Sequence, residues 1–397
     1  MTPQEIVSAA EDIVGRIQDQ GHRTSLTFAG VTTAYQSDES ATSEWIRRFF
    51  EGYFLPSDTP EPDATVYSTG DAGLFALLQT YASQQPTPAL GKNQYVDVPF
   101  TDDVALIQAK ATKVTPEEEV FQLLFKGQRR IVLVTSGNLE VRSEEAMQTL
   151  RSLIKWLLLE QGWIPMHSAC VAKDGRAICI TGAKASGKTS TLLNLLARNG
   201  CDLLAIDKFL IRDSGSRVEI CGLPGKSGIR VGSAIAQPHV LTWLAEQTTP
   251  FFPNIGAEQV RHIAETSTPE QLRTRSEKVH LLPTELASLF QVSITPRAPL
   301  ELVLIPVFDL GAAEARLVRA EPEQSAEMLM GCYAGLLSKG EGFLLHFFDL
   351  SDDVLKERLA SLLDTHLHHI ETYELHQNHT TNQQAAKLVA GALQAGK

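Results

Sequence analysis

Apolar residues recur along this chain at two spacings, and each spacing predicts a different kind of element. Residues 3–18 place Ile6, Ala9, Ile13 and Ile17 on one face of a helix, which is typical of an amphipathic helix packed against a core. Short apolar runs bounded by polar or turn residues predict strands instead. In the first 140 residues these patterns predict strands over 26–35, 64–68, 95–99, 104–108 and 130–135, and helices over 42–54 and 73–81.

A long amphipathic helix is predicted next, ending near Gln161 where Gly162 stops it. Either Ser136 or Asn138 is expected to cap its start, because both side chains can accept hydrogen bonds from helical N–H groups. The run 166–172, which begins beside His167, predicts a strand. The turn signal Lys173-Asp174-Gly175 predicts that this strand pairs with another over 176–181.

The second of these strands leads into the segment Gly182-Ala183-Lys184-Ala185-Ser186-Gly187-Lys188-Thr189, and a helical pattern then runs to Asn199. Glycines at the first and sixth positions allow a tight turn whose N–H groups point inward as an anion nest. The helix that follows adds its positive N-terminal end. We therefore expect residues 182–190, Ser190 included, to bind nucleotide phosphates. Lys188 would reach the β- or γ-phosphate and the Thr189 hydroxyl would ligate Mg²⁺.

The next apolar stretch lies within residues 201–212, and Asp207 interrupts it in the middle. A carboxylate at the end of a strand beside a phosphate loop is where a Mg²⁺ ligand is expected. The alternative is a surface acid in a turn, and the apolar surroundings favour the metal ligand. A turn at 213–216 and a returning strand over 217–221 complete a predicted hairpin.

Composition restricts the class of protein. The chain has 397 residues with 43% hydrophobic and 21% charged residues, which is typical of a globular protein of one large or two ordinary domains. The net charge of −12 argues against a nucleic-acid partner. No apolar run is long enough to span a membrane, and the first residues do not resemble a signal peptide. Five cysteines without zinc spacing indicate buried thiols in a reducing cytoplasm.

The segments Met166-His167-Ser168-Ala169, 182–189 and Leu203 to Asp207 together resemble the catalytic domain of the HPr kinase/phosphorylase family and its serine-kinase-like relatives. They resemble ATP-dependent phosphoenolpyruvate carboxykinase more distantly. Gly222-Leu223-Pro224 and Ile229-Arg230-Val231-Gly232 fit the same pattern, so the good match covers about 150–235. A weaker likeness continues through a strand over 300–307, a helix near 323–337, a strand over 371–375 and a helix over 382–393.

The resemblance implies an α/β fold. Residues 141–397 would form a phosphoenolpyruvate-carboxykinase-like P-loop core with a mixed sheet. Residues 1–140 would form an N-terminal α/β region for substrate or partner recognition, in which we recognise no catalytic motif.

The same resemblance implies an ATP- and Mg²⁺-dependent kinase that transfers the γ-phosphoryl group to a hydroxyl of a peptide, protein or small molecule. Thr189 and Asp207 would hold Mg²⁺, and Lys188 would stabilise the transferring group. His167 would face the metal and γ-phosphate, and Arg230 sits where relatives carry substrate-proximal residues. Relatives often self-associate, and the sequence leaves the oligomeric state open.

One position departs from the family pattern. The family usually carries two adjacent acids here, and the first acts as general base towards the substrate hydroxyl; this chain has Ile206 in that place. Either another group accepts the proton, with His167 and Asp213 as candidates, or the substrate needs no base. The third alternative is a catalytically silent nucleotide-binding protein that regulates or scaffolds a partner.

Two further segments attract attention. The span 246–279 has the Pro and Gly content of an insertion or lid that contains some helix. Five histidines lie between 366 and 379, but their spacing is not the helical pair that zinc enzymes use. We therefore expect a solvated connection there and no metal site.

Overall fold

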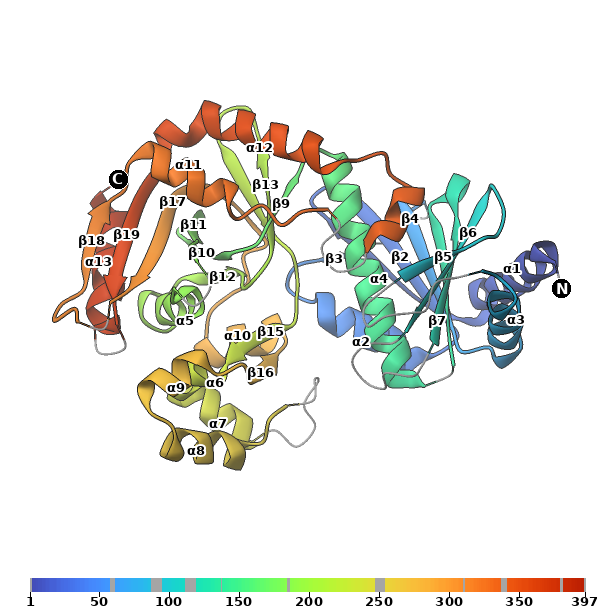
Figure 1. Cartoon of the computed structure of the whole chain (residues 1–397), viewed down its shortest axis with the longest axis horizontal. Coiled ribbons are helices and arrows are strands. Elements are labelled where there is room, and N and C mark those ends of the chain that lie inside the picture. The colour runs from blue at the N-terminus through green and yellow to red at the C-terminus, as the bar shows by residue number, and fades with distance from the viewer. Residues whose placement is uncertain are drawn as a thin grey trace. The chain divides into compact units, whose positions relative to one another are not determined.

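The computed structural model describes residues 2–57, 61–86, 95–110, 119–136, 138–183, 186–246, 254–309, 311–336, 341–378 and 381–395. The chain divides into two compact units, which are taken separately below. The first contains residues 1–162 and 335–352, and the second contains 163–334 and 353–397. Figure 1 shows the elements of both.

The first unit is built on a mixed eight-stranded sheet. Its order is β3 (Leu55–Pro56), β1 (His22–Phe28), β2 (Val31–Ser37), β4 (Ala64–Thr69), β8 (Arg130–Thr135), β7 (Glu119–Phe125), β6 (Val104–Lys110) and β5 (Tyr95–Val98). The three neighbours β2, β4 and β8 are parallel, and the other pairs are antiparallel.

Helices cover both faces of this sheet. On one face, α1 (Pro3–Gln20) and α3 (Ala72–Ser83) bury their apolar sides against strand residues such as Phe121, Leu123 and Val132. On the other face lie α2 (Ser40–Phe50) and α4 (Leu139–Glu160), which contact each other and the strands (Figure 1). The segment 341–352 belongs to this unit because Phe348 packs on Trp156, with ring centroids 5.7 Å apart.

The start of α4 follows the sequence expectation. Of the two predicted caps, Asn138 takes the position, and its Oδ1 accepts hydrogen bonds from the N–H groups of Glu140 (3.0 Å) and Val141 (3.3 Å). These bonds satisfy donors that have no partner inside the helix. The cap therefore fixes where the chain turns from β8 into α4.

Replacing Asn138 with alanine should destabilise the first unit by about 1 kcal/mol, because two helical N–H groups would lose their acceptor. Urea unfolding followed by circular dichroism measures the change. An Asn138→Asp variant, which keeps the acceptor, should unfold like the wild type. Equal losses in both variants would show that the side-chain oxygen is not what stabilises the helix start.

The second unit contains a nine-stranded mixed sheet. Its main path is β12 (Asp202–Ala205), β10 (Ala169–Lys173), β11 (Arg176–Ile180), β17 (Arg297–Phe308), β14 (Val218–Gly222), β13 (Phe209–Asp213) and β9 (Ile164–Met166). The strand β19 (Glu371–Gln377) pairs in parallel with β17, and β18 (Arg316–Arg319) pairs with β19.

Alternate strand residues face opposite sides of this sheet, as the two-residue period of a strand requires. Val171, Ile178 and Ile180 pack towards α5 (Lys188–Asn199) and α13 (Asn382–Ala395). Cys170 and Cys179 face α11 (Pro322–Met330) and α12 (Asp352–His366) instead. Because helices cover both faces of the sheet, the sequences of its strands are nearly continuous apolar runs.

A smaller group of elements packs on the α5 side of the same core. It contains a two-stranded antiparallel sheet of β15 (Ser227–Arg230) and β16 (Lys278–Leu281). The helices of this group are α6 (Val231–Ile235), α7 (Pro238–Glu246), α8 (Ala257–Thr266), α9 (Pro269–Thr274) and α10 (Pro283–Phe290) (Figure 1). The described part of the expected insertion, 246–279, contains α8 and α9, so the prediction of some helix there is confirmed.

The α/β class with mixed sheets is confirmed, and several finer predictions need correction. The expected strand 26–35 is two strands, β1 and β2, which meet at a tight turn formed by Ala29 (φ 51°) and Gly30 (φ 89°). The expected strand 166–172 is interrupted at His167 and Ser168, because β9 pairs with β13 whereas β10 pairs with β11. The helix near 323–337 ends at Met330.

The expected boundary after residue 140 also differs from the division that the contacts draw. Helix α4 packs on the first sheet through Val141, Leu150 and their neighbours, so it lies with the N-terminal unit. Within the described part of the chain, none of the helices is long and apolar enough to cross a membrane. All five cysteines are buried free thiols.

Candidate functional site

Three predicted site segments meet at one edge of the second sheet. Strand β10 runs antiparallel to both of its neighbours, β11 and β12. The start of β10 therefore lies at the same edge as the ends of β11 and β12 (Figure 1). His167 precedes β10, the Gly182 to Thr189 segment follows β11, and Asp207 follows β12. The strand pairing alone thus brings His167 between the loop and Asp207.

His167 and Asp207 face each other across this edge. The His167 Nε2 atom lies 3.6 Å from Asp207 Oδ1, and the two side chains are 56% and 62% exposed. The His167 backbone N–H donates to the carbonyl of Cys332 at 2.7 Å, which fixes the chain at this point. Both side chains are therefore accessible to a ligand, and a contact this exposed contributes little to stability.

The loop itself has the backbone geometry that its glycines allow. Gly182 has φ 138° and Gly187 has φ 104°, values in the region that disfavours other residues. A Cβ on Gly182 would lie 3.0 Å from Ser186 Oγ, so the loop also closes tightly there. Among the described residues, the buried Ser186 Oγ has no hydrogen-bond partner. Lys184 and Ala185, both predicted to bind nucleotide, lie outside the described residues.

Lys188 turns back onto the loop. Its Nζ donates to the carbonyls of Gly182 (2.7 Å) and Ala183 (2.9 Å). Burial lowers the pKa of its ammonium, while the nearby Cys332 and Asp207 raise it and the Arg230 guanidinium lowers it. The charges of Asp207 and Arg230 therefore both act on Lys188. Four predicted site residues therefore lie near one another: Lys188, Asp207, Arg230 and His167, which contacts Asp207.

The first turn of α5 carries the predicted hydroxyl groups. Thr189, its second residue, is half-buried. The Ser190 Oγ lies 3.1 Å from Ser233 Oγ of α6, so this turn is linked to the β15–α6 segment. Arg230 ends β15 and immediately precedes α6.

Two contact residues were not predicted from sequence. The Cys332 thiol contacts the Thr181 hydroxyl directly below the loop. Burial and the neighbouring Cys179 raise the pKa of that thiol, and bonds from Thr181 and the Gly182 N–H lower it. The Gln377 amide donates to Thr191 Oγ1 of α5 at 2.5 Å. Both residues are far along the chain from the loop, and neither belongs to a recognisable motif.

Asp213 is not part of this group. It lies at the end of β13 remote from Met166, because β13 and β9 pair Phe209 with Met166 and Ile211 with Ile164. Its carboxylate is 2.9 Å from the Nε2 atom of the buried His366 and accepts from the Gly215 N–H at 2.7 Å. The suggestion that Asp213 acts as general base is therefore wrong. His366 is also no solvated connection residue, since its side chain is 6% exposed.

These contacts make a small acid-dependent contribution to stability. The Gly215 N–H, followed by His366, lowers the pKa of Asp213 from its ordinary 3.8. A carboxyl group whose pKa is lower in the folded than in the unfolded protein stabilises the fold at pH values above its unfolded pKa. This contribution disappears as the pH falls through its folded pKa. Asp213→Asn should cost under about 1 kcal/mol at pH 7, because the carboxylate is largely exposed. Urea unfolding should show this difference shrinking below pH 4, and a constant difference would contradict the assignment.

The donor set at the edge fits magnesium. A threonine hydroxyl and a carboxylate are oxygen ligands of the kind that Mg²⁺ prefers, and its remaining positions are commonly filled by water and phosphate. In the described ranges no cluster of three or more His, Cys, Asp or Glu side chains forms a metal site. Thr189 and Asp207 would therefore supply only part of the coordination of Mg²⁺, and a bound phosphate would supply further oxygen ligands.

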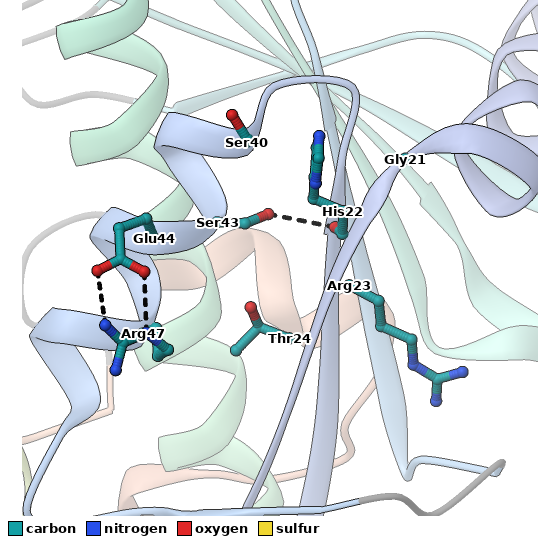
Figure 2. A pocket seen from close by; sticks show the side chains of 8 residues that line it. All are labelled: Gly21, His22, Arg23, Thr24, Ser40, Ser43, Glu44 and Arg47. Carbon is teal, nitrogen blue, oxygen red and sulfur yellow. Dashed lines mark hydrogen bonds and ion pairs between the residues drawn. The ribbon is translucent and has the colours of Figure 1, made fainter.

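The first unit has a separate surface depression, shown in Figure 2. It lies between the start of β1 and α2, and is lined by Gly21, His22, Arg23, Thr24, Ser40, Ser43, Glu44 and Arg47. Glu44 pairs with Arg47, and Ser43 Oγ donates to the His22 carbonyl at 3.2 Å. None of the predicted site residues lines it.

Comparison with protein-family models finds no match to this chain. A search of curated proteins likewise finds none with significant similarity. The functional argument therefore depends on the residues and geometry described above.

Proposed function

We propose that this protein is an ATP- and Mg²⁺-dependent kinase that transfers the γ-phosphoryl group to a hydroxyl of a peptide, protein or small molecule. The observation that carries the proposal is the edge at which the Lys188 loop, His167 and Asp207 converge, with His167 Nε2 and Asp207 Oδ1 3.6 Å apart. Phosphoryl transfer needs positioning and charge stabilisation more than covalent chemistry, and these residues are of the types required.

Each residue would have a defined role. The loop N–H groups and the N-terminus of α5 would bind the phosphates, with Lys188 supplying a positive charge to the transferring group. Thr189 and Asp207 would hold Mg²⁺, which neutralises charge on the β- and γ-phosphates when bound. Arg230, whose charge acts on Lys188, would face an anionic part of the acceptor.

The proton of the acceptor hydroxyl needs a recipient. Ile206 occupies the position of the usual base and is partly buried against the core beside α5. With Asp213 excluded, His167 is the remaining candidate, and a ring nitrogen can accept a proton near neutral pH. We propose that the hydroxyl oxygen attacks phosphorus, its proton passes to His167, and ADP leaves.

The order of elements supports the resemblance to the HPr kinase/phosphorylase family and a carboxykinase-like P-loop core. The chain runs from a histidine beside β10, through β11 and the loop, to α5 and the acid after β12. A cytoplasmic location, recognition of the acceptor by the N-terminal unit and self-association are parts of the proposal that follow from the same resemblance.

The second candidate is a silent nucleotide-binding protein, and Ile206 is the observation that favours it. The kinase and the silent protein differ in whether they convert ATP to ADP. The purified chain is incubated with ATP, Mg²⁺ and hydroxyl-bearing acceptors such as serine peptides, and ADP is measured by a coupled assay. Acceptor-dependent ADP release supports the kinase. ATP binding without ADP release from any acceptor would support the silent protein.

A further inference from the structure

The carboxyl ends of three parallel strands meet at one edge of the first unit's sheet. After β2 and β8 the chain passes into α2 and α4 on one face, whereas after β4 it passes into α3 on the other (Figure 1). The gap between β2 and β4 is therefore a topological switch point. In open α/β sheets, ligands bind preferentially outside the carboxyl ends of strands at such a point.

Buried hydroxyl groups lie just below this edge. Tyr35 and Ser37 of β2 and Ser68 of β4 are each 0% exposed. Ser37 pairs with Ser68 and Tyr35 with Val66, so all three side chains share the face that α2 and α4 cover. Among the described residues, the Tyr35 phenol oxygen and Ser68 Oγ have no hydrogen-bond partner. Burying unpaired hydroxyls is unfavourable, so a group that hydrogen-bonds to them here would stabilise the fold.

A cation and an anion complete the cluster. Arg142, in the first turn of α4, donates through NH1 to Asp38 Oδ1 at 2.8 Å, while Thr69 Oγ1 donates to Asp38 Oδ2 at 2.6 Å. Asp38 thus fixes the guanidinium, whose buried Nε has no partner among the described residues. Burial raises the pKa of Tyr35 to about 12, with Ser68, Ser37 and Arg142 lowering it and Asp38 raising it. Those groups therefore surround the phenol.

We propose that this switch point binds an oxyanion, the carboxylate or phosphate group of a small molecule. Among the described residues, the Tyr35 phenol oxygen, Ser68 Oγ and Arg142 Nε form no hydrogen bond of good geometry, and the N-termini of α2 and α4 lie at the same edge. Asp38 is already bonded to Arg142 and Thr69, so it acts as a positioning group for the guanidinium. The site is independent of the kinase proposal because it uses residues of the first unit alone.

The test titrates inorganic phosphate and acetate, at constant ionic strength, into the full chain carrying Lys188→Ala, so that the loop after β11 does not contribute. We expect a saturable rise in melting temperature of about 3 °C at ten times the Kd. Tyr35→Phe and Ser68→Ala should each remove that rise, and both should fold, because each deletes one hydroxyl and leaves the rest of its side chain in place. A response to phosphate alone or to acetate alone identifies which oxyanion is preferred.

Tyr67→Phe is the matched control. Tyr67 lies in β4 on the opposite face, and its hydroxyl already accepts from Gln18 Nε2 at 2.8 Å, so this variant should respond to the anion like its parent. If neither anion gives a saturable rise, or if the rise survives in both Tyr35→Phe and Ser68→Ala, ordered water satisfies these hydroxyls and the proposal is overturned.

Discussion

Lys188→Ala is expected to weaken ATP binding by about 100- to 1,000-fold, because removing one partner of a desolvated charge pair costs several kcal/mol. The ammonium now bonds to the carbonyls of Gly182 and Ala183 and lies where a triphosphate would meet it. The fold should survive, since both carbonyls belong to a surface loop. Equilibrium binding of a fluorescent ATP analogue, with circular dichroism as a folding check, measures the effect.

Lys173→Ala is the control for this variant. Lys173 donates to the carbonyls of Asn199 (2.8 Å) and Gly200 (3.2 Å) at the other end of α5, so its loss should affect helix stability without touching the loop. ATP affinity should stay at the wild-type value in this variant. If Lys188→Ala binds ATP as tightly as the wild type, the loop is not the phosphate site.

Asp207→Asn is expected to lower Mg²⁺-dependent turnover by about 100-fold or more, because the amide cannot supply the negative charge that holds the ion. The side chain is 62% exposed, so the substitution should leave stability unchanged. ADP release measured against Mg²⁺ concentration should show both a lower maximum and a weaker Mg²⁺ dependence.

Asp213→Asn provides the comparison for that loss. It removes a carboxylate from the next strand along the chain, β13, but at the end remote from the site, and its turnover at pH 7 should match the wild type. Wild-type turnover and Mg²⁺ dependence in Asp207→Asn would remove Asp207 from the proposed metal site.

The sequence predicts most of the elements because their signals are local. The turn at Asp174 and Gly175, both with positive φ, and the cap at Asn138 depend on residues within a few positions. The turn at Ala29 and Gly30 was missed because alanine is an unusual residue at a positive φ. The strand break at His167 was missed because it depends on which neighbour each half pairs with, and that pairing involves β13, more than forty residues away.

The same distinction separates the predicted from the unpredicted parts of the site. The Gly182 to Thr189 segment and Asp207 were found because a motif and its spacing carry their chemistry. Cys332 and Gln377 reach α5 and its loop from elements far along the chain, and a buried thiol or amide has no local sequence signal. The pairing of Asp213 with His366 is equally non-local, so the sequence alone leaves Asp213 as a candidate base.

A crystal structure of the chain soaked with ATP and Mg²⁺ tests the central claim most directly. The account predicts triphosphate density against the backbone between Thr181 and Thr189, with Lys188 Nζ moved from the Gly182 and Ala183 carbonyls to a phosphate oxygen. An empty loop, with Lys188 still bonded to both carbonyls at saturating ATP, would contradict it.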